Sequence, residues 1–337
     1  GKPRSISALS DGFLEVLANS SHAERLLELQ QDYPELKWVE TQDMSSSELI
    51  TLVVEEVIDY TVADSNDVSL VRRYHPEVRV AFDISEQQGL AWAMPELEDD
   101  SLYQAAVEFL DSIKKSGELD TMLARHYGHI RNYDYAGTPT YRRHIAGRLP
   151  TYMDQFKSAA EANGLDWRLV AAVAYQESHW NPLAVSPTGV KGIMMLTKVT
   201  AAELGIEERT DPIQSIEGGA RYLKKLFDKF ADLPDPDRTW LALAAYNVGY
   251  GHVKDAQWLT EMSGGDPTQW TDVKQKLPLL SKRKWYRQTR YGYARGHEPV
   301  KYVENIRSYY DILRWHFDRE KPRNERKPIM AFSPPAL

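Results

Sequence analysis

The residue best suited to chemistry in this sequence is a glutamate at the end of an apolar stretch. Glu177 closes the run "DWRLVAAVAYQES", which can begin as a helix capped by Asp166. On a helix, the residues three, four and seven positions before Glu177 share its face, and they are Ala174, Val173 and Val170. Burial and the negative end of a helix dipole both raise a carboxyl pKa. Such an acid can donate a proton near neutral pH, although a solvated glutamate at a frayed helix end fits the same pattern.

A second acid that would act together with Glu177 is missing from the neighbouring sequence. Enzymes that hydrolyse glycosidic bonds bring two carboxyl groups together, roughly 5 Å apart or about 6.5–9.5 Å apart. The acids at 203, 207 and 208 lie in a polar stretch, and Glu298 is placed to begin the last helix. No second acid of this kind therefore accompanies Glu177 in this stretch.

Three further blocks follow Glu177 in order. The first, "SHWNPLAVSPTGVKGIMMLT", has the Asn-Pro, Ser-Pro and glycine residues of a fixed loop. The others are "AAYNVGYG" (244–251) and "EPVKYVENI" (298–306). Together with Glu-Ser at 177–178, they resemble the signature of soluble-lytic-transglycosylase-type domains, which are lysozyme-like folds that cut peptidoglycan. The four blocks span roughly 130 residues, so the match is specific.

The resemblance implies a role for each matching residue. Glu177 would be the catalytic acid and base, and Tyr302 would orient it. Four further residues would contact the substrate: Ser186, Met195, Tyr246 and Asn247. Met195 departs from the family, because many members have glutamine there. Turn capping explains the serine and asparagine equally well, and core packing explains the tyrosines.

The resemblance also implies the reaction. One glutamate would protonate the leaving GlcNAc O4 and then take the proton of the MurNAc C6 hydroxyl, which closes on C1 to leave a 1,6-anhydro end. No cofactor or metal is expected. Two alternatives stay open: a goose-lysozyme-type hydrolase on the same fold, and a module that binds peptidoglycan or an amino acid without catalysis.

The rest of the chain must position this site. With 337 residues and a mean hydropathy of −0.53, two water-exposed domains are expected. The net charge of −8 argues against nucleic acid as a partner, and the chain contains no cysteine. We expect an α/β domain over residues 1–131, a linker over 132–142, a mainly α lysozyme-like domain over 143–318 and a loosely ordered tail over 319–337.

The front part alternates strand and helix patterns. Strands are expected at 13–18, 59–64, 78–84 and 89–95, and a helix capped by Ser20 or Ser21 follows the first. This part resembles the second lobe of family-3 periplasmic amino-acid-binding proteins, with the first lobe largely absent. The resemblance implies a regulatory ligand, an amino acid or cell-wall peptide, at Ser20, Ser21 and Asp64. Caps and a turn acid are the alternative reading.

The segment 271–307 is basic and aromatic. It holds ten Lys and Arg residues against three Asp and Glu, interleaved with tryptophan and tyrosine. Aromatic faces stack on sugar rings and guanidinium groups pair with carboxylates, so the composition suits peptidoglycan, or simply a solvated surface. The pairing of the two domains resembles membrane-bound transglycosylases, which implies a periplasmic location at the outer membrane. The targeting segment is expected to be missing from this sequence.

Overall fold

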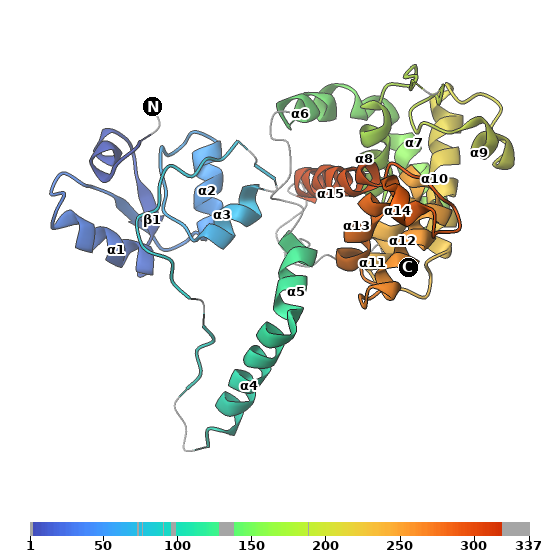
Figure 1. Ribbon diagram of the computed structural model, residues 1–337. Helices are drawn as coiled ribbons and strands as arrows, with labels where there is room; N and C mark the ends of the chain where they lie inside the picture. The colour runs from blue at the N-terminus through green and yellow to red at the C-terminus, as the bar shows by residue number, and fades with distance from the viewer. Residues whose placement is uncertain are drawn as a thin grey trace. The chain divides into compact units, whose positions relative to one another are not determined.

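The structure is a computed structural model that describes residues 3–72, 74–75, 77–89, 91–95, 99–127, 138–187 and 189–318. The chain divides into two compact units, Gly1–Leu123 and Ala124–Leu337 (Figure 1). The described residues are mainly helical. Within them, no helix combines the length and the apolar character that crossing a membrane requires. The predicted tail, residues 319–337, lies outside the described residues.

The first unit contains a small parallel sheet. Strand β1 (Glu15–Leu17) pairs in parallel with β2 (Val39–Thr41), and Leu14 forms a further parallel bridge to Tyr60. Buried Leu14 and Val16 pack with the apolar face of α1 to form the core of this unit. The helical elements of the unit are η1 (Ile6–Asp11), α1 (Ser21–Gln30), α2 (Ser46–Val54), α3 (Ser65–Arg72) and α4 (Ser101–Ser116), and α5 (Glu118–Tyr127) crosses its C-terminal boundary.

The expectation of a larger α/β sheet is not met in the described residues, where only these two strands form. The predicted strand at 13–18 is confirmed as β1, but 61–64, 78–84 and the described part of 89–95 have no strand structure. The alternation at 78–84 has another cause, because Phe82 and Ile84 pack onto the small core while Val80 stays exposed. Strand β2 was missed because Val39 is exposed, so no apolar pattern marks it.

The second unit is an assembly of helices. Helix α6 begins at Thr138, inside the predicted linker, and the helical pattern expected from residue 143 onward is confirmed. The helices are α6 (Thr138–Gly147), α7 (Leu149–Ala162), α8 (Trp167–Ser178), α9 (Lys198–Glu203), α10 (Pro212–Asp228), α11 (Asp237–Val248), α12 (Tyr250–Met262), α13 (Trp270–Lys276), η4 (Leu277–Ser281), α14 (Arg283–Tyr286) and α15 (His297–Asp318).

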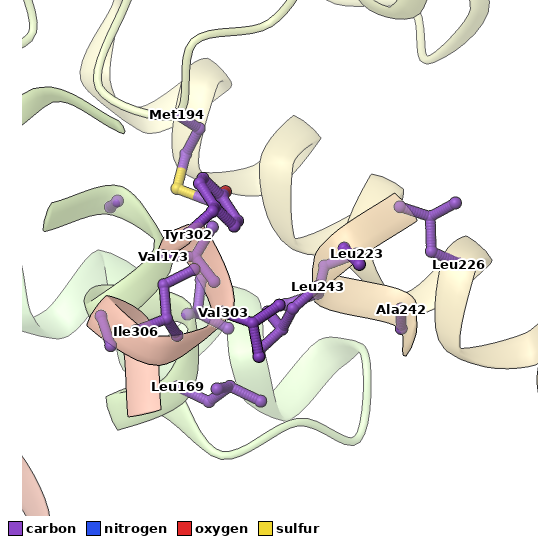
Figure 2. Close-up of a cluster of buried hydrophobic side chains, with 14 of the residues drawn as sticks. Leu169, Val173, Met194, Leu223, Leu226, Ala242, Leu243, Tyr302, Val303 and Ile306 are labelled. Carbon is purple, nitrogen blue, oxygen red and sulfur yellow. The ribbon is translucent and has the colours of Figure 1, made fainter. Parts of the chain in front are cut away.

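Two buried helices form the centre of this unit. In α8 every residue from 169 to 175 is buried, and in α11 the same holds from 239 to 245. A helix that is apolar on all sides must be surrounded by protein. Helix α8 packs against α7 and α15, and α11 packs against α10, α12 and α15. Figure 2 shows side chains from these helices meeting in one cluster, with Val173, Leu243, Val303 and Ile306 among them.

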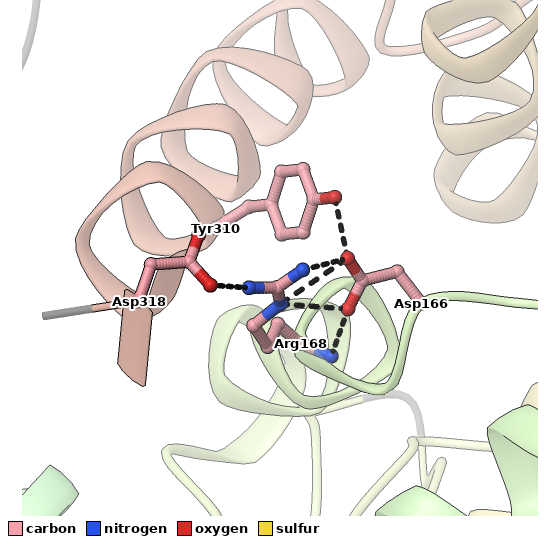
Figure 3. Close-up of polar contacts among 4 residues, drawn as sticks. All are labelled: Asp166, Arg168, Tyr310 and Asp318. Carbon is pink, nitrogen blue, oxygen red and sulfur yellow. Dashed lines mark hydrogen bonds and ion pairs between the residues drawn. The ribbon is translucent and has the colours of Figure 1, made fainter. Parts of the chain in front are cut away.

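The N-terminus of α8 is fixed to α15 by a polar network (Figure 3). Asp166 is the predicted cap, and its Oδ1 accepts the backbone N–H of Arg168 at 2.9 Å. The Arg168 guanidinium pairs with Asp166 at 2.7 Å and with Asp318 at 2.9 Å. The Tyr310 hydroxyl donates to Asp166 at 2.8 Å. These contacts hold α8 against α15, which also carries Tyr302, eight residues before Tyr310.

Candidate active site

The C-terminal turn of α8 is closed by three residues that fix the direction of the chain. His179 ends the helix in the left-handed region at φ 53°, and Trp180 follows at φ 57°. The Trp180 indole N–H donates to the Ala171 carbonyl at 2.8 Å, so the chain folds back onto its own helix. Arg148 donates to the His179 carbonyl at 2.9 Å. This fixed turn determines where the preceding Glu177 side chain lies.

Glu177 and Tyr302 lie in direct contact. The Tyr302 hydroxyl donates to Glu177 Oε1 at 2.5 Å, joining the end of α8 to α15. Glu177 is half-buried as a residue, and Tyr302 is buried. Burial raises the pKa of the Glu177 carboxyl to about 7 from an ordinary value of 4.5, while the hydrogen bond from Tyr302 acts in the opposite direction. The carboxyl group can therefore both hold and release a proton near neutral pH.

The loop after α8 is attached to the same turn. The Ser178 hydroxyl contacts the carbonyls of Ala174 and Ile193 at 3.1 and 2.8 Å, and it accepts the Asn181 N–H. Gly192 has φ +91°, and a Cβ there would lie 1.8 Å from the Arg209 carbonyl oxygen. Only glycine fits such a position. Ser178 belongs to the Glu-Ser block that carries the family resemblance, but its role in holding this loop was not predicted from the sequence.

Tyr246, on α11, is a second tyrosine that lies near Glu177. Its hydroxyl donates to the Met194 carbonyl at 2.9 Å, and its ring meets Tyr222 edge to face. Burial raises the Tyr246 pKa, and the charge of Glu177 adds to that rise, which indicates that the two groups are close. Asn247, the next residue, is exposed near the end of α11.

The remaining predicted substrate residues lie in the loop. Ser186 is half-buried, and its hydroxyl accepts the Val190 N–H at 3.0 Å, so it acts as a turn residue here. Met195 is half-buried with φ 50°, directly after the Met194 carbonyl that Tyr246 contacts. The structure thus brings Tyr302 and Tyr246 to Glu177, and it links Met195 to that site through the backbone. A substrate role for these residues stays a prediction.

The other acids considered as partners lie elsewhere in this unit. Those at 203, 207, 208 and 298 are all exposed. Glu203 pairs with Lys225, Glu208 contacts Thr210, and Glu298 stands in the first turn of α15 beside Arg295. No acidic side chain contributes to the pKa shift of Glu177 in the described part of the chain. The geometry thus leaves Glu177 as a single acid.

The residues predicted to hold a regulatory ligand lie at two helix N-termini of the first unit. Ser20 caps α1, accepting the Ala23 N–H at 3.3 Å and donating to the Leu17 carbonyl at 2.5 Å. Ser21 is exposed in the first turn. Asp64 precedes α3, and its carboxylate contacts His22 at 3.2 Å. This contact joins Asp64 to the first turn of α1 through His22, a residue that the sequence analysis did not predict.

Comparison with known proteins finds related sequences over most of this chain. The family model described as "Transglycosylase SLT domain" matches residues 154–266, which include Glu177 and Tyr246. A membrane-bound lytic murein transglycosylase F 1 from Alkalilimnicola ehrlichii is 52% identical over 93% of this chain and 64% of its own length. The relative named membrane-bound lytic murein transglycosylase F from Idiomarina loihiensis is 46% identical over 93% of this chain and 69% of its own length. A solved lytic transglycosylase Slt from Pseudomonas aeruginosa is 19% identical with a TM-score of 0.41, covering 93% of this chain and 48% of that one.

The helical second unit thus contains the stretch that matches the transglycosylase SLT domain. The chain belongs to the membrane-bound lytic murein transglycosylase F family. It spans a little under two thirds of the length of the first relative. The SLT match covers residues 154–266, and the solute-binding-like part of the expected architecture stays a prediction.

We expect Tyr302→Phe to move the pH profile of the Glu177 site. Removing the hydroxyl takes away the hydrogen bond that stabilises the carboxylate form, so the pKa of Glu177 rises. The alkaline limb of kcat against pH shifts to higher pH, and kcat at neutral pH falls about ten-fold, because a hydrogen bond to a charged group is lost. Turnover of purified sacculi from pH 5 to 9 measures both.

Tyr310→Phe is the matched control. It makes the same change on the same helix, but its hydroxyl contacts Asp166 at the opposite end of α8. It lowers thermal stability and leaves the alkaline limb in place. An unshifted limb in Tyr302→Phe contradicts the role assigned to this contact.

Proposed function

We propose that this chain is a peptidoglycan lytic transglycosylase in which Glu177 acts first as the acid and then as the base. The observation that carries the proposal is the state of that one carboxyl group. It is half-buried, burial raises its pKa to about 7, and it contacts one hydroxyl and no second acid in the described residues. A group with a pKa near the working pH can both give and take a proton in one cycle.

The proposed reaction needs only the substrate and this carboxyl group. Glu177 gives its proton to the GlcNAc O4 as the bond from that oxygen to MurNAc C1 breaks. The resulting carboxylate takes the proton from the MurNAc C6 hydroxyl, whose oxygen forms the new bond to C1. Protons balance, and Glu177 ends protonated as it began. The Tyr302 hydroxyl stabilises the carboxylate between the two steps.

The missing second acid supports this reaction over hydrolysis. A hydrolase needs a carboxylate to activate water or to attack C1. The C6 hydroxyl is part of the substrate, so it has the high effective concentration of an intramolecular nucleophile. Ser186, Met195, Tyr246 and Asn247 are proposed to line the glycan site, since Tyr246 and the loop it contacts lie beside Glu177.

We further propose the domain assignment that goes with this activity. Residues 143–318 form the catalytic domain, and residues 1–131 form a partial lobe like that of solute-binding proteins. The parallel pairing of β1 with β2 and the two helix N-termini joined by His22 and Asp64 support such a lobe. Its ligand is an amino acid or cell-wall peptide that regulates the enzyme. The names of the relatives support a location at a membrane, and we propose the periplasmic face of the outer membrane.

Glu177→Gln tests the proposed activity. Glutamine keeps the size of the side chain and loses the transferable proton, so turnover of purified sacculi falls about 10²- to 10⁴-fold. Mass spectrometry of the wild-type digest shows anhydro ends, which lack the water that a hydrolase adds.

Glu207→Gln is the control for this experiment, because it makes the same substitution at an exposed acid and keeps full activity. Reducing ends in the wild-type products identify a hydrolase instead. Negligible wild-type turnover that Glu177→Gln leaves unchanged identifies a module without catalysis.

Asp64→Asn tests the regulatory site. We expect calorimetric titration of the whole protein with stem peptides purified from peptidoglycan to show binding. The variant binds at least ten-fold more weakly, because it loses the charge that would pair with a ligand amino group. Asp67→Asn, a first-turn acid of α3, leaves binding intact. The regulatory proposal is wrong if the wild-type protein binds none of these peptides.

A further inference from the structure

A cluster of exposed cations lies in the second unit between η4 and α15. We call residues 282–293 the basic segment. It carries five exposed side chains, none of which pairs with a carboxylate in the described part of the chain: Lys282, Arg283, Lys284, Arg287 and Arg290. The protein as a whole has a net charge of −8, so this cluster opposes the overall charge. Like charges this close repel one another unless an anion lies between them.

The basic segment is held in place by its backbone. The buried carboxylate of Asp255, on α12, accepts the N–H groups of Arg290 and Tyr291 at 3.0 and 2.9 Å. The Tyr291 ring lies against Gly251, where a Cβ would come within 2.5 Å of it. These contacts anchor the C-terminal end of the basic segment, and its five cationic side chains are exposed. Arg283 and Lys284 lie on α14.

Aromatic side chains lie among these cations. Tyr291 and Tyr293 are 49% and 57% exposed, which is high for tyrosine in a folded unit. Lys284 lies over the Trp285 ring and Arg290 over the Tyr291 ring. Exposed aromatic faces bind sugar rings, and the cations beside them bind carboxylates. A ligand with both features suits this surface best.

Both sides of the basic segment connect to elements of the Glu177 site. Tyr291 packs on Gly251 in the first turn of α12, directly after the end of α11 that carries Tyr246 and Asn247. The chain then runs from Tyr293 into α15, which carries Tyr302. This continuity favours the glycan in the site over a separate ligand elsewhere.

We propose that the basic segment binds the carboxylates of the peptides attached to the glycan strand, and so makes this enzyme prefer peptide-bearing glycan to bare glycan. The inference rests on the proposed function and adds a determinant of substrate choice. Arg283, Lys284 and Arg287 supply the charge, and Tyr291 and Tyr293 contact the sugar. The effect acts mainly on KM, because these residues are not part of the contacts around Glu177.

The test compares two substrates at low salt: intact sacculi, and sacculi from which an amidase has removed the peptides. The variant Arg283→Gln/Lys284→Gln/Arg287→Gln neutralises three exposed cations of the basic segment. We expect the ratio of kcat/KM on intact over bare glycan to fall at least five-fold, through KM. The wild-type ratio also falls as salt rises, because salt screens exposed charges.

The control variant is Lys198→Gln/Arg221→Gln/Lys254→Gln, which removes the same charge from exposed positions on α9, α10 and α12. It keeps the wild-type ratio. An equal loss on both substrates, or an unchanged ratio in the basic-segment variant, overturns the proposal. The proposal is also overturned if the basic-segment variant loses binding to anionic phospholipid vesicles while its ratio of kcat/KM stays unchanged. That result would identify the basic segment as a membrane-binding surface.

Failure of the proposed function gives a different result. If the wild-type protein cleaves neither substrate, co-sedimentation of the same variants with intact and bare sacculi still measures the preference. Binding to intact sacculi that is stronger than to bare sacculi, and that is lost in the basic-segment variant alone, supports the peptide contact without catalysis. Equal sedimentation with both overturns it.

Discussion

The contact on which the site depends is the one between a half-buried carboxyl group and a buried tyrosine hydroxyl. Glu177 lies in the last turn of a helix in which residues 169–175 are all buried, so its carboxyl group is less solvated than a surface acid. Burial of the charged carboxylate costs free energy, so the pKa of the group rises and it keeps its proton to a higher pH. The 2.5 Å contact with Tyr302 offsets part of that cost when the proton leaves. Both protonation states are therefore accessible near neutral pH, as a group that gives and retakes one proton requires.

The surrounding structure keeps this contact in place from both ends of α8. At the N-terminus, Asp166 and Arg168 join the helix to α15 through Tyr310 and Asp318. At the C-terminus, non-glycine residues adopt the left-handed conformation at His179 and Trp180, which costs roughly 1–2 kcal/mol per residue. The indole hydrogen bond of Trp180 and the contact of Arg148 offset that strain. Strain of this kind persists where neighbouring packing over-determines the backbone.

The sequence predicted the helical unit well because its signals are local. The Asp166 cap, the apolar run of α8 and the glycine after α11 each determine a boundary within a few residues. Glu177 and Tyr302 are 125 residues apart, and only the family resemblance paired them in advance. The front part was harder. Its alternating stretch at 78–84 looks like a strand, but a strand needs a neighbour with free backbone groups, and Phe82 and Ile84 pack on the core without one. Contacts such as Asp255 with the Tyr291 backbone leave no pattern in the sequence at all.

The raised pKa of Glu177 is tested most directly by the difference in unfolding free energy between wild type and Glu177→Gln across pH 4 to 9. Below the ordinary pKa of 4.5 the carboxyl group is protonated in both the folded and the unfolded chain, so the pH-dependent part of the difference is absent. Between 4.5 and about 7 only the folded chain keeps the proton, so wild-type stability falls with rising pH relative to the variant. The loss approaches roughly 3 kcal/mol and levels off above pH 7. A difference that stays flat across this range means that Glu177 titrates as an ordinary surface acid, and it contradicts the account.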